Sequence, residues 1–143
     1  AALQRSEGAA LEFASVALRA DRELVLSSVR KDGLVLRHAS KELRQDRDVV
    51  LAAVEENGSA LQHAGDRLQD DLEVALVAVQ ESGQAIQFTS KRLRENKELV
   101  LAAVRQRGCL LACIGAGLRR NKAVVLAAVA QDGGALEHAD ETL

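Results

Sequence analysis

Hydrophobic and polar positions along the chain repeat with a period of 25 residues. Each period contains a glycine, an aliphatic residue three places later and a leucine ten places later. The glycines are Gly8, Gly33, Gly58, Gly83, Gly108 and Gly133. No insertion or deletion interrupts the series, so the sequence predicts a repeat protein in which every unit meets the next in one geometry.

The apolar spacing within one period predicts two helical segments. The first is about twelve residues, or about 18 Å, long. It begins at an N-cap, Asp46, and has a broad apolar face across residues 49–54. Gly58 follows its last turn, where a residue in the left-handed conformation commonly ends a helix. Apolar residues at positions 60, 61, 64 and 68 then share one face of a second helix.

The position seven residues after each glycine leaves the form of this second helix open. It holds small or cap-forming residues, namely Ser15, Ser40, Gly65, Ser90, Gly115 and Asp140. Such residues either break the helix into two short pieces or permit close packing of a continuous one. Both interpretations are compatible with the pattern.

We therefore expect an all-α fold, an α-solenoid of stacked short helical hairpins. Composition agrees, because 48% of residues are hydrophobic, Pro, Trp and Tyr are absent, and Ala and Leu dominate. The 143 residues form a single helical-repeat domain, which we expect to be part of a longer array or assembly. Its units are residues 1–20 (partial), 21–45, 46–70, 71–95, 96–120 and 121–143.

Histidines and cysteines are the first candidates for chemistry. One repeat position holds Phe13, His38, His63, Phe88, Cys113 and His138. A position that accepts His, Phe and Cys is a semi-buried packing position, and equivalent residues of adjacent repeats lie about 8–10 Å apart, too far to share a metal ion. Cys109 and Cys113 suit neither a disulfide nor a zinc site, and we expect both to be small core residues in a reducing, intracellular compartment.

Motifs that mark enzymes do not occur in the sequence. It has no Gly-rich phosphate loop, no GxSxG elbow and no HExxH pair. We expect a protein that is not an enzyme, with no catalytic residue, cofactor or metal. No apolar run approaches the length of a transmembrane helix.

Charge is distributed unevenly along the chain. The whole sequence has a net charge of −2, but residues 89–123 contain nine basic and two acidic residues, a net charge of +7. We expect part of this block to form one surface, because it spans two adjacent repeats. The candidate interaction residues are Lys91, Arg92, Arg94, Lys97, Arg105, Arg107, Arg119, Arg120 and Lys122.

The repeat pattern resembles a known family. The segment 46–54, DRDVVLAAV, followed by Gly58, Leu61, His63-Ala64 and Leu68, is similar to the repeat called domain of unknown function 4116. The resemblance covers essentially the whole chain, with departures at residues 115–116 and 123. That family occurs in protists and has no established activity, so the resemblance implies a repeat module of a larger protein or assembly.

These observations favour a non-catalytic protein-interaction scaffold, or an accessory subunit of a larger multi-subunit complex, with a protein partner. The alternative is a phosphate-binding surface for nucleic acid or anionic lipid through the basic block 91–122. Nucleic acid is the less favoured partner, because only 1% of residues are aromatic and bases have no stacking platform. A third interpretation is an array whose exposed faces are inert.

Overall fold

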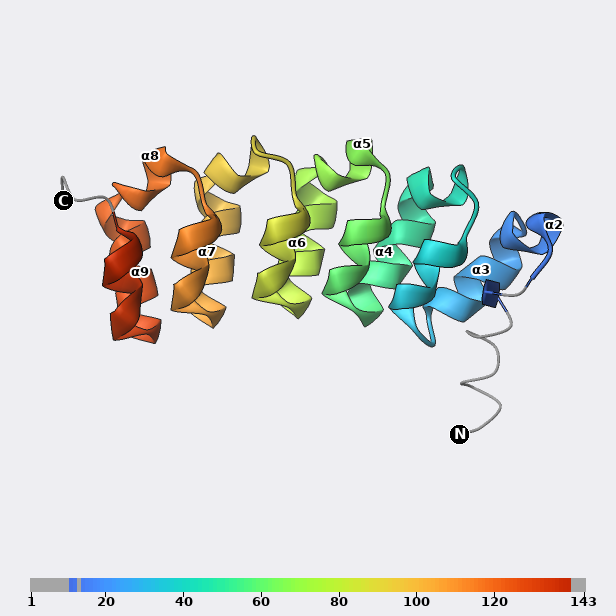
Figure 1. The fold of residues 1–143 in the computed structure, drawn as a ribbon, viewed down its shortest axis with the longest axis horizontal. Helices are drawn as coiled ribbons and strands as arrows, with labels where there is room; N and C mark the ends of the chain where they lie inside the picture. The colour runs from blue at the N-terminus through green and yellow to red at the C-terminus, as the bar shows by residue number, and fades with distance from the viewer. Residues whose placement is uncertain (1–10, 13, 140–143) are drawn as a thin grey trace.

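The computed structural model of the protein describes residues 11, 12 and 14–139, and every regular element within them is helical. The longest helices form one row. They are α3 (Arg22–Val29), α4 (Arg47–Glu56), α6 (Leu72–Glu81), α7 (Lys97–Gln106) and α9 (Lys122–Gln131). Each lies beside the next in Figure 1, and neighbouring helices of the row contact one another.

A second row consists of 3₁₀-helices, each directly after a long helix. They are η1 (Gly33–His38), η3 (Gly58–His63), η4 (Gly83–Phe88), η6 (Gly108–Cys113) and η7 (Gly133–His138). Short segments then lead to the next long helix. They are α2 (Val16–Arg19), η2 (Leu43–Gln45), α5 (Asp66–Gln69), η5 (Leu93–Glu95) and α8 (Ala116–Arg119).

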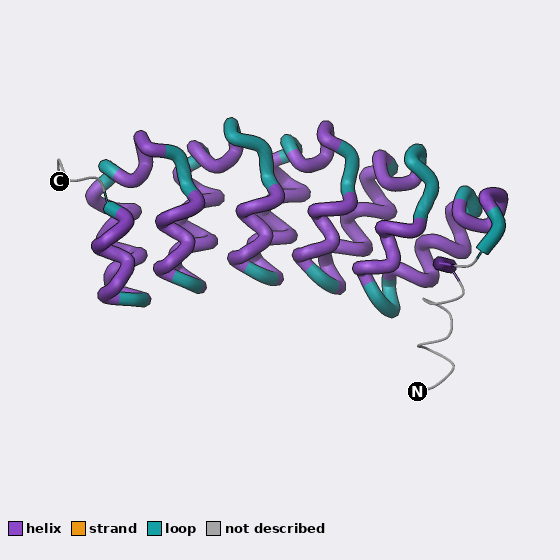
Figure 2. Tube along the Cα trace, in the orientation of Figure 1, coloured by secondary structure: helices purple, strands orange, loops and turns teal. Residues whose placement is uncertain are grey.

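The repeated three-part unit gives an elongated stack. Figure 2 shows helical segments joined by short loops throughout, and Figure 1 shows α5 and α8 along one edge of the stack, above the long helices. The predicted all-α repeat fold is therefore confirmed. Its units are less simple than helical hairpins, because the return segment is divided in two.

The long helices begin where the sequence predicts. Asp46 has an extended backbone, and its carboxylate accepts hydrogen bonds from the N–H groups of Asp48 and Val49 at 3.0 and 3.2 Å. Asn121 makes the same type of cap for α9. The helix after Asp46 has ten residues instead of about twelve, since Asn57 leaves the helical conformation to cap η3.

The return segment breaks at the position that the sequence left open. Gly65 and Gly115 both have extended backbones and precede the second short piece. The break frees a backbone donor for the neighbouring unit, because the Gly65 N–H donates to the Arg44 carbonyl at 2.8 Å. The same bond joins Ser90 to Gln69 at 3.1 Å. The break is thus part of the interface between units.

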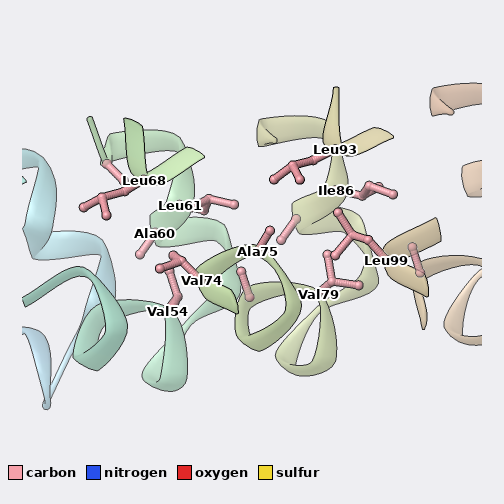
Figure 3. Close-up of a cluster of buried hydrophobic side chains, with 14 of the residues drawn as sticks. Val54, Ala60, Leu61, Leu68, Val74, Ala75, Val79, Ile86, Leu93 and Leu99 are labelled. Carbon is pink, nitrogen blue, oxygen red and sulfur yellow. The ribbon is translucent and has the colours of Figure 1, made fainter. Parts of the chain in front are cut away.

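The core runs between the two rows along the whole stack. Figure 3 shows aliphatic side chains from successive units, among them Val54, Leu61, Val74 and Ile86, meeting in one continuous cluster. These four side chains are fully buried. Burial of such a side chain stabilises the fold by about 1.5–3 kcal/mol, so stacking supplies the burial that one short unit lacks.

The recurrent glycines do not adopt the left-handed backbone conformation that the sequence predicts. No glycine among the described residues has a positive φ, so the expected left-handed helix end at Gly58 is wrong. Gly58 is needed for space instead, because a Cβ there would lie 2.3 Å from the Ala78 carbonyl oxygen of the next unit. Its N–H also donates to the Glu81 carboxylate. Glycine therefore permits the backbones of adjacent units to approach each other.

Candidate interaction surface

The basic block lies on two opposite edges of the stack. Seven residues lie at the edge formed by the short segments and the starts of α7 and α9, which we call the basic edge; they are Lys91, Arg92, Arg94, Lys97, Arg119, Arg120 and Lys122. Arg105 is in the last turn of α7 and Arg107 follows it. A ten-residue helix is about 15 Å long, so these two arginines are separated from the basic edge.

Arg92, on the basic edge, is paired with a carboxylate of the previous unit. Its Nε lies 3.0 Å from Asp70 Oδ1, and its Nη2 donates to the Asp70 carbonyl at 2.7 Å. The pKa of Asp70 lies below its ordinary value, first because the Ser90 hydroxyl donates to it and second because Arg92 does. This pair anchors the turn before η5 to the previous unit and largely neutralises Arg92.

In two earlier units, the arginine that begins the long helix is paired with carboxylates of the following unit. The Arg22 guanidinium reaches Asp46 at 2.9 Å and Asp48 at 3.0 Å in the following unit. Arg47 repeats this arrangement with Asp71 and Glu73. Hydrogen bonding from Arg22 is the main reason that the pKa of Asp46 lies below its ordinary value. Each pair joins an exposed arginine to a half-buried N-cap aspartate and an exposed second carboxylate, and so links neighbouring units.

The same position on α7 has lost its acidic partners. Lys97 occupies the place of Arg47, but the following unit provides Asn121 and Ala123 where the earlier one provides two carboxylates. The helix cap survives, because Asn121 Oδ1 accepts from the Ala123 and Val124 N–H groups at 3.0 and 3.3 Å. Lys97 is exposed and, within the described part of the chain, has no carboxylate within 4.0 Å.

A small groove opens on the basic edge. It has a volume of about 220 Å³ and is lined by Lys91, Arg94, Glu95, Cys113, Ile114 and Gly115. A Cβ on Gly115 would lie 2.5 Å from Glu95 Cγ, so glycine lets this side chain lie against the backbone. An equivalent groove of about 230 Å³ recurs two units earlier, with Lys41 and Arg44 in place of Lys91 and Arg94. Both can accept a small acidic group between two cations.

A second groove, of about 660 Å³, lies between α3 and α4. Its floor is Leu26 and Leu51, and its walls carry Arg22 on one side and Glu55 on the other. Because Arg22 is already paired with carboxylates, this groove has mixed charge and no net preference for anions. It contributes apolar contact area at the N-terminal half of the stack.

The histidine column is a packing position, as predicted. His38, His63, Phe88 and Cys113 are all half-buried, whereas Phe13 lies outside the residues whose burial is described. Desolvation is the main reason that the pKa of His63 lies below its ordinary value, and nearby Arg37 and Arg44 act in the same direction. Searched over the described residues, the structure contains no group of three or more His, Cys, Asp or Glu that could hold a metal ion.

The two cysteines differ in solvent exposure. Cys113 packs against the core, but Cys109 is exposed, so the prediction that both are core residues is wrong for Cys109. The reason is that both lie in η6, where 3₁₀ geometry has three residues per turn, so residues four apart do not share one face. No helix of the described chain is both long and apolar enough to span a membrane.

Sequence analysis missed the side chains that hold the units together. Gly33 and Gly83 donate their N–H groups to Glu56 Oε2 at 2.5 Å and Gln106 Oε1 at 2.6 Å. The signal was available, because the position 23 residues after each of four successive glycines holds Glu or Gln.

Comparisons with known proteins agree with the repeat geometry. Neither the curated proteins nor the solved structures contain a match to this chain. A family model, Domain of unknown function (DUF4116), matches residues 1–44, 46–94, 71–119 and 96–143, overlapping windows that together cover nearly the whole sequence. With its 25-residue stacked units, the chain belongs to the DUF4116 family.

Proposed function

We infer that this chain is a non-catalytic scaffold, or an accessory subunit of a larger assembly, that binds an acidic segment of a protein partner along the basic edge. The observation that carries the proposal is the loss of acidic partners opposite Lys97. Asn121 keeps the helix cap while removing the charge, so the change alters the surface and leaves the fold intact. A cation without a partner is available to an external carboxylate.

The geometry of the stack supports a recognition surface. Neighbouring units are joined by a backbone bond such as Gly115 N–H to the Arg94 carbonyl, at 3.2 Å, and by a continuous core. Side chains mounted on such a framework keep fixed spacing, which lowers the entropic cost of binding. The grooves described above are shallow surface features shared by neighbouring units. Such grooves are better suited to contact with an extended segment of a partner than to enclosing a small substrate.

An acidic protein segment fits this edge better than a nucleic acid does. Aromatic side chains are few, because Trp and Tyr are absent and the only phenylalanines in the sequence are Phe13 and Phe88. Stacking on aromatic side chains provides much of the affinity for single strands, so phosphate contacts alone would give weak, salt-sensitive binding. Carboxylates need only the paired cations at the groove of Lys91 and Arg94.

Fluorescence anisotropy with three probes tests the proposal. The probes are a labelled Glu/Asp-rich peptide, a single-stranded RNA and vesicles containing phosphatidylserine. We expect the peptide to bind and the double charge reversal K97E/K122E to weaken it roughly tenfold or more. The matched control R105E/R107E makes the same change in net charge at the opposite edge of the stack and should retain binding, apart from a small long-range effect.

Each other result has a defined meaning. Binding of RNA or vesicles, lost in K97E/K122E, without binding of the peptide would establish the phosphate-binding alternative instead. Equal loss in R105E/R107E would show a general charge effect and no localised site. If none of the three probes binds, the basic edge is a solvated surface and the proposal is wrong.

A further inference from the structure

The last described unit has an apolar end face that equivalent faces elsewhere in the stack do not expose. Leu136 is 62% exposed, whereas Leu111, in the same place one unit earlier, is fully buried. Leu126 is 58% exposed, and Val129 is half-buried although its equivalent Val104 is fully buried. In each earlier unit the corresponding side chains are covered by the long helix that follows.

Gly133 is a second, independent feature of this face. A Cβ on Gly108 would lie 2.3 Å from the Ala128 carbonyl oxygen of the next unit, so glycine is required there. A Cβ on Gly133 would have no neighbour within 4 Å, and no described glycine has a positive φ. Nothing in the described part of the chain therefore requires glycine at 133. The residue matches the contact that a following unit would make.

We propose that the end face of α9 and η7 is a docking site for a further unit of this repeat, which continues the stack in the same register. We call the surface formed by Leu126, Val129, Gly133 and Leu136 the end face. The incoming helix would have a small residue at its seventh position, as Ala53 is in α4, and Glu or Gln at its tenth. The first would meet Gly133, and the second would accept its N–H.

The same contact rules select a repeat unit over a second copy of this chain. Each internal junction with a described glycine uses Glu or Gln as acceptor, for example Glu56 for Gly33 and Gln131 for Gly108. The long helix nearest the opposite end of the chain, α3, is followed by Lys31 at the equivalent position. An ammonium group has no lone pair, so it cannot accept the Gly133 N–H. The proposal is independent of the basic edge.

An in-register extension of the full chain tests the proposal. Leu143 occupies the same place in its unit as Leu43, so residues 44–70 of this sequence can follow it directly and supply one further long helix with its acceptor. We expect a higher urea midpoint and a larger m-value than for the original chain, because additional surface is buried. Hydrogen exchange of the Gly133 amide should slow roughly tenfold or more.

Two substitutions distinguish an added unit that docks on the end face from one that is only joined to the chain. Gly133→Ala should leave the original chain as stable as before but abolish both effects in the extended chain, because the Cβ meets the incoming backbone. Glu56→Lys in the appended copy should restore fast exchange at Gly133. Gly134→Ala is the matched control: its place holds Leu34 and Cys109 in other units, so the extended chain should tolerate it.

Two results would overturn the proposal. One is an extended chain with unchanged midpoint and unprotected Gly133, or one in which Gly133→Ala has no effect, since either means that the added unit does not use this face. The other is concentration-dependent self-association of the original chain in sedimentation that Gly133→Ala abolishes. That outcome would assign the end face to a second copy.

Discussion

Gly58→Ala is the most direct test of how these units stack. The new Cβ would lie 2.3 Å from the Ala78 carbonyl oxygen and 2.8 Å from Glu81 Oε2. Neither contact can be relieved by rotating a free side chain, because the first atom is backbone and the second is the group that accepts the Gly58 N–H. The two units must therefore move apart or tilt.

The expected loss has two components. Overpacking in a tightly packed contact costs about 1–3 kcal/mol. Lengthening the hydrogen bond from Gly58 to the Glu81 carboxylate costs about 1 kcal/mol more, since a poorly satisfied buried donor is unfavourable. Together these predict a decrease of about 2–4 kcal/mol in the free energy of unfolding, a large share of the stability of an ordinary domain.

Urea denaturation followed by far-UV circular dichroism measures this loss, because the chain has no Trp or Tyr for fluorescence. The matched control is Gly133→Ala, the same substitution where a Cβ has no neighbour within 4 Å. Alanine there should be neutral or stabilise by up to about 1 kcal/mol by restricting the unfolded chain. Equal free energies of unfolding for the two variants would refute the close-approach explanation.

Two further predictions concern charge. The pKa of His63 is lowered mainly by burial, so the unfolded state binds a proton more readily than the folded state. The free energy of unfolding should therefore be higher above about pH 6.5 and fall as the pH decreases below it. This pH dependence should diminish in His63→Phe, which mimics Phe88, when the free energy of unfolding is measured against pH. Asn121→Asp should return a carboxylate to Lys97, leave stability unchanged or slightly higher, and weaken binding of the acidic peptide in the anisotropy assay. An unchanged peptide affinity would count against the role given to Lys97.

Much of the fold could be predicted because the repeat displays its own constraints. The N-cap at Asp46 and the apolar face of 49–54 follow from local chemistry, and both appear in the structure. The break in the return segment could not be decided, because Gly65 fits a close-packed helix as well as a break. What decides it is a bond to another unit, from the Gly65 N–H to the Arg44 carbonyl, which local propensity does not include.

The candidate surface was harder to predict than the fold. Nine basic residues lie within residues 91–122 of the sequence, but Lys97 begins α7 and Arg105 lies in its last turn. Counting charge along the chain therefore overstates the size of the surface. Counting it by repeat position separates the two edges, since residues 25 apart stack and residues eight apart on one helix do not. Cys109 fails for a related reason, because its face depends on 3₁₀ geometry.

The Asp-to-Asn changes show where this fold can vary without loss of stability. Asp46 performs two tasks, capping α4 and accepting an ion pair from the preceding unit. Asn121 performs only the first. Because an amide oxygen caps a helix as well as a carboxylate does, the fold does not constrain the charge at this position. The glycines between described units, in contrast, are constrained by space, because a Cβ there would press against the backbone of the next unit. Surface charge can therefore vary independently of stacking. Units with the same core and the same junctions can carry different surface charges, as we propose for an array that recognises partners.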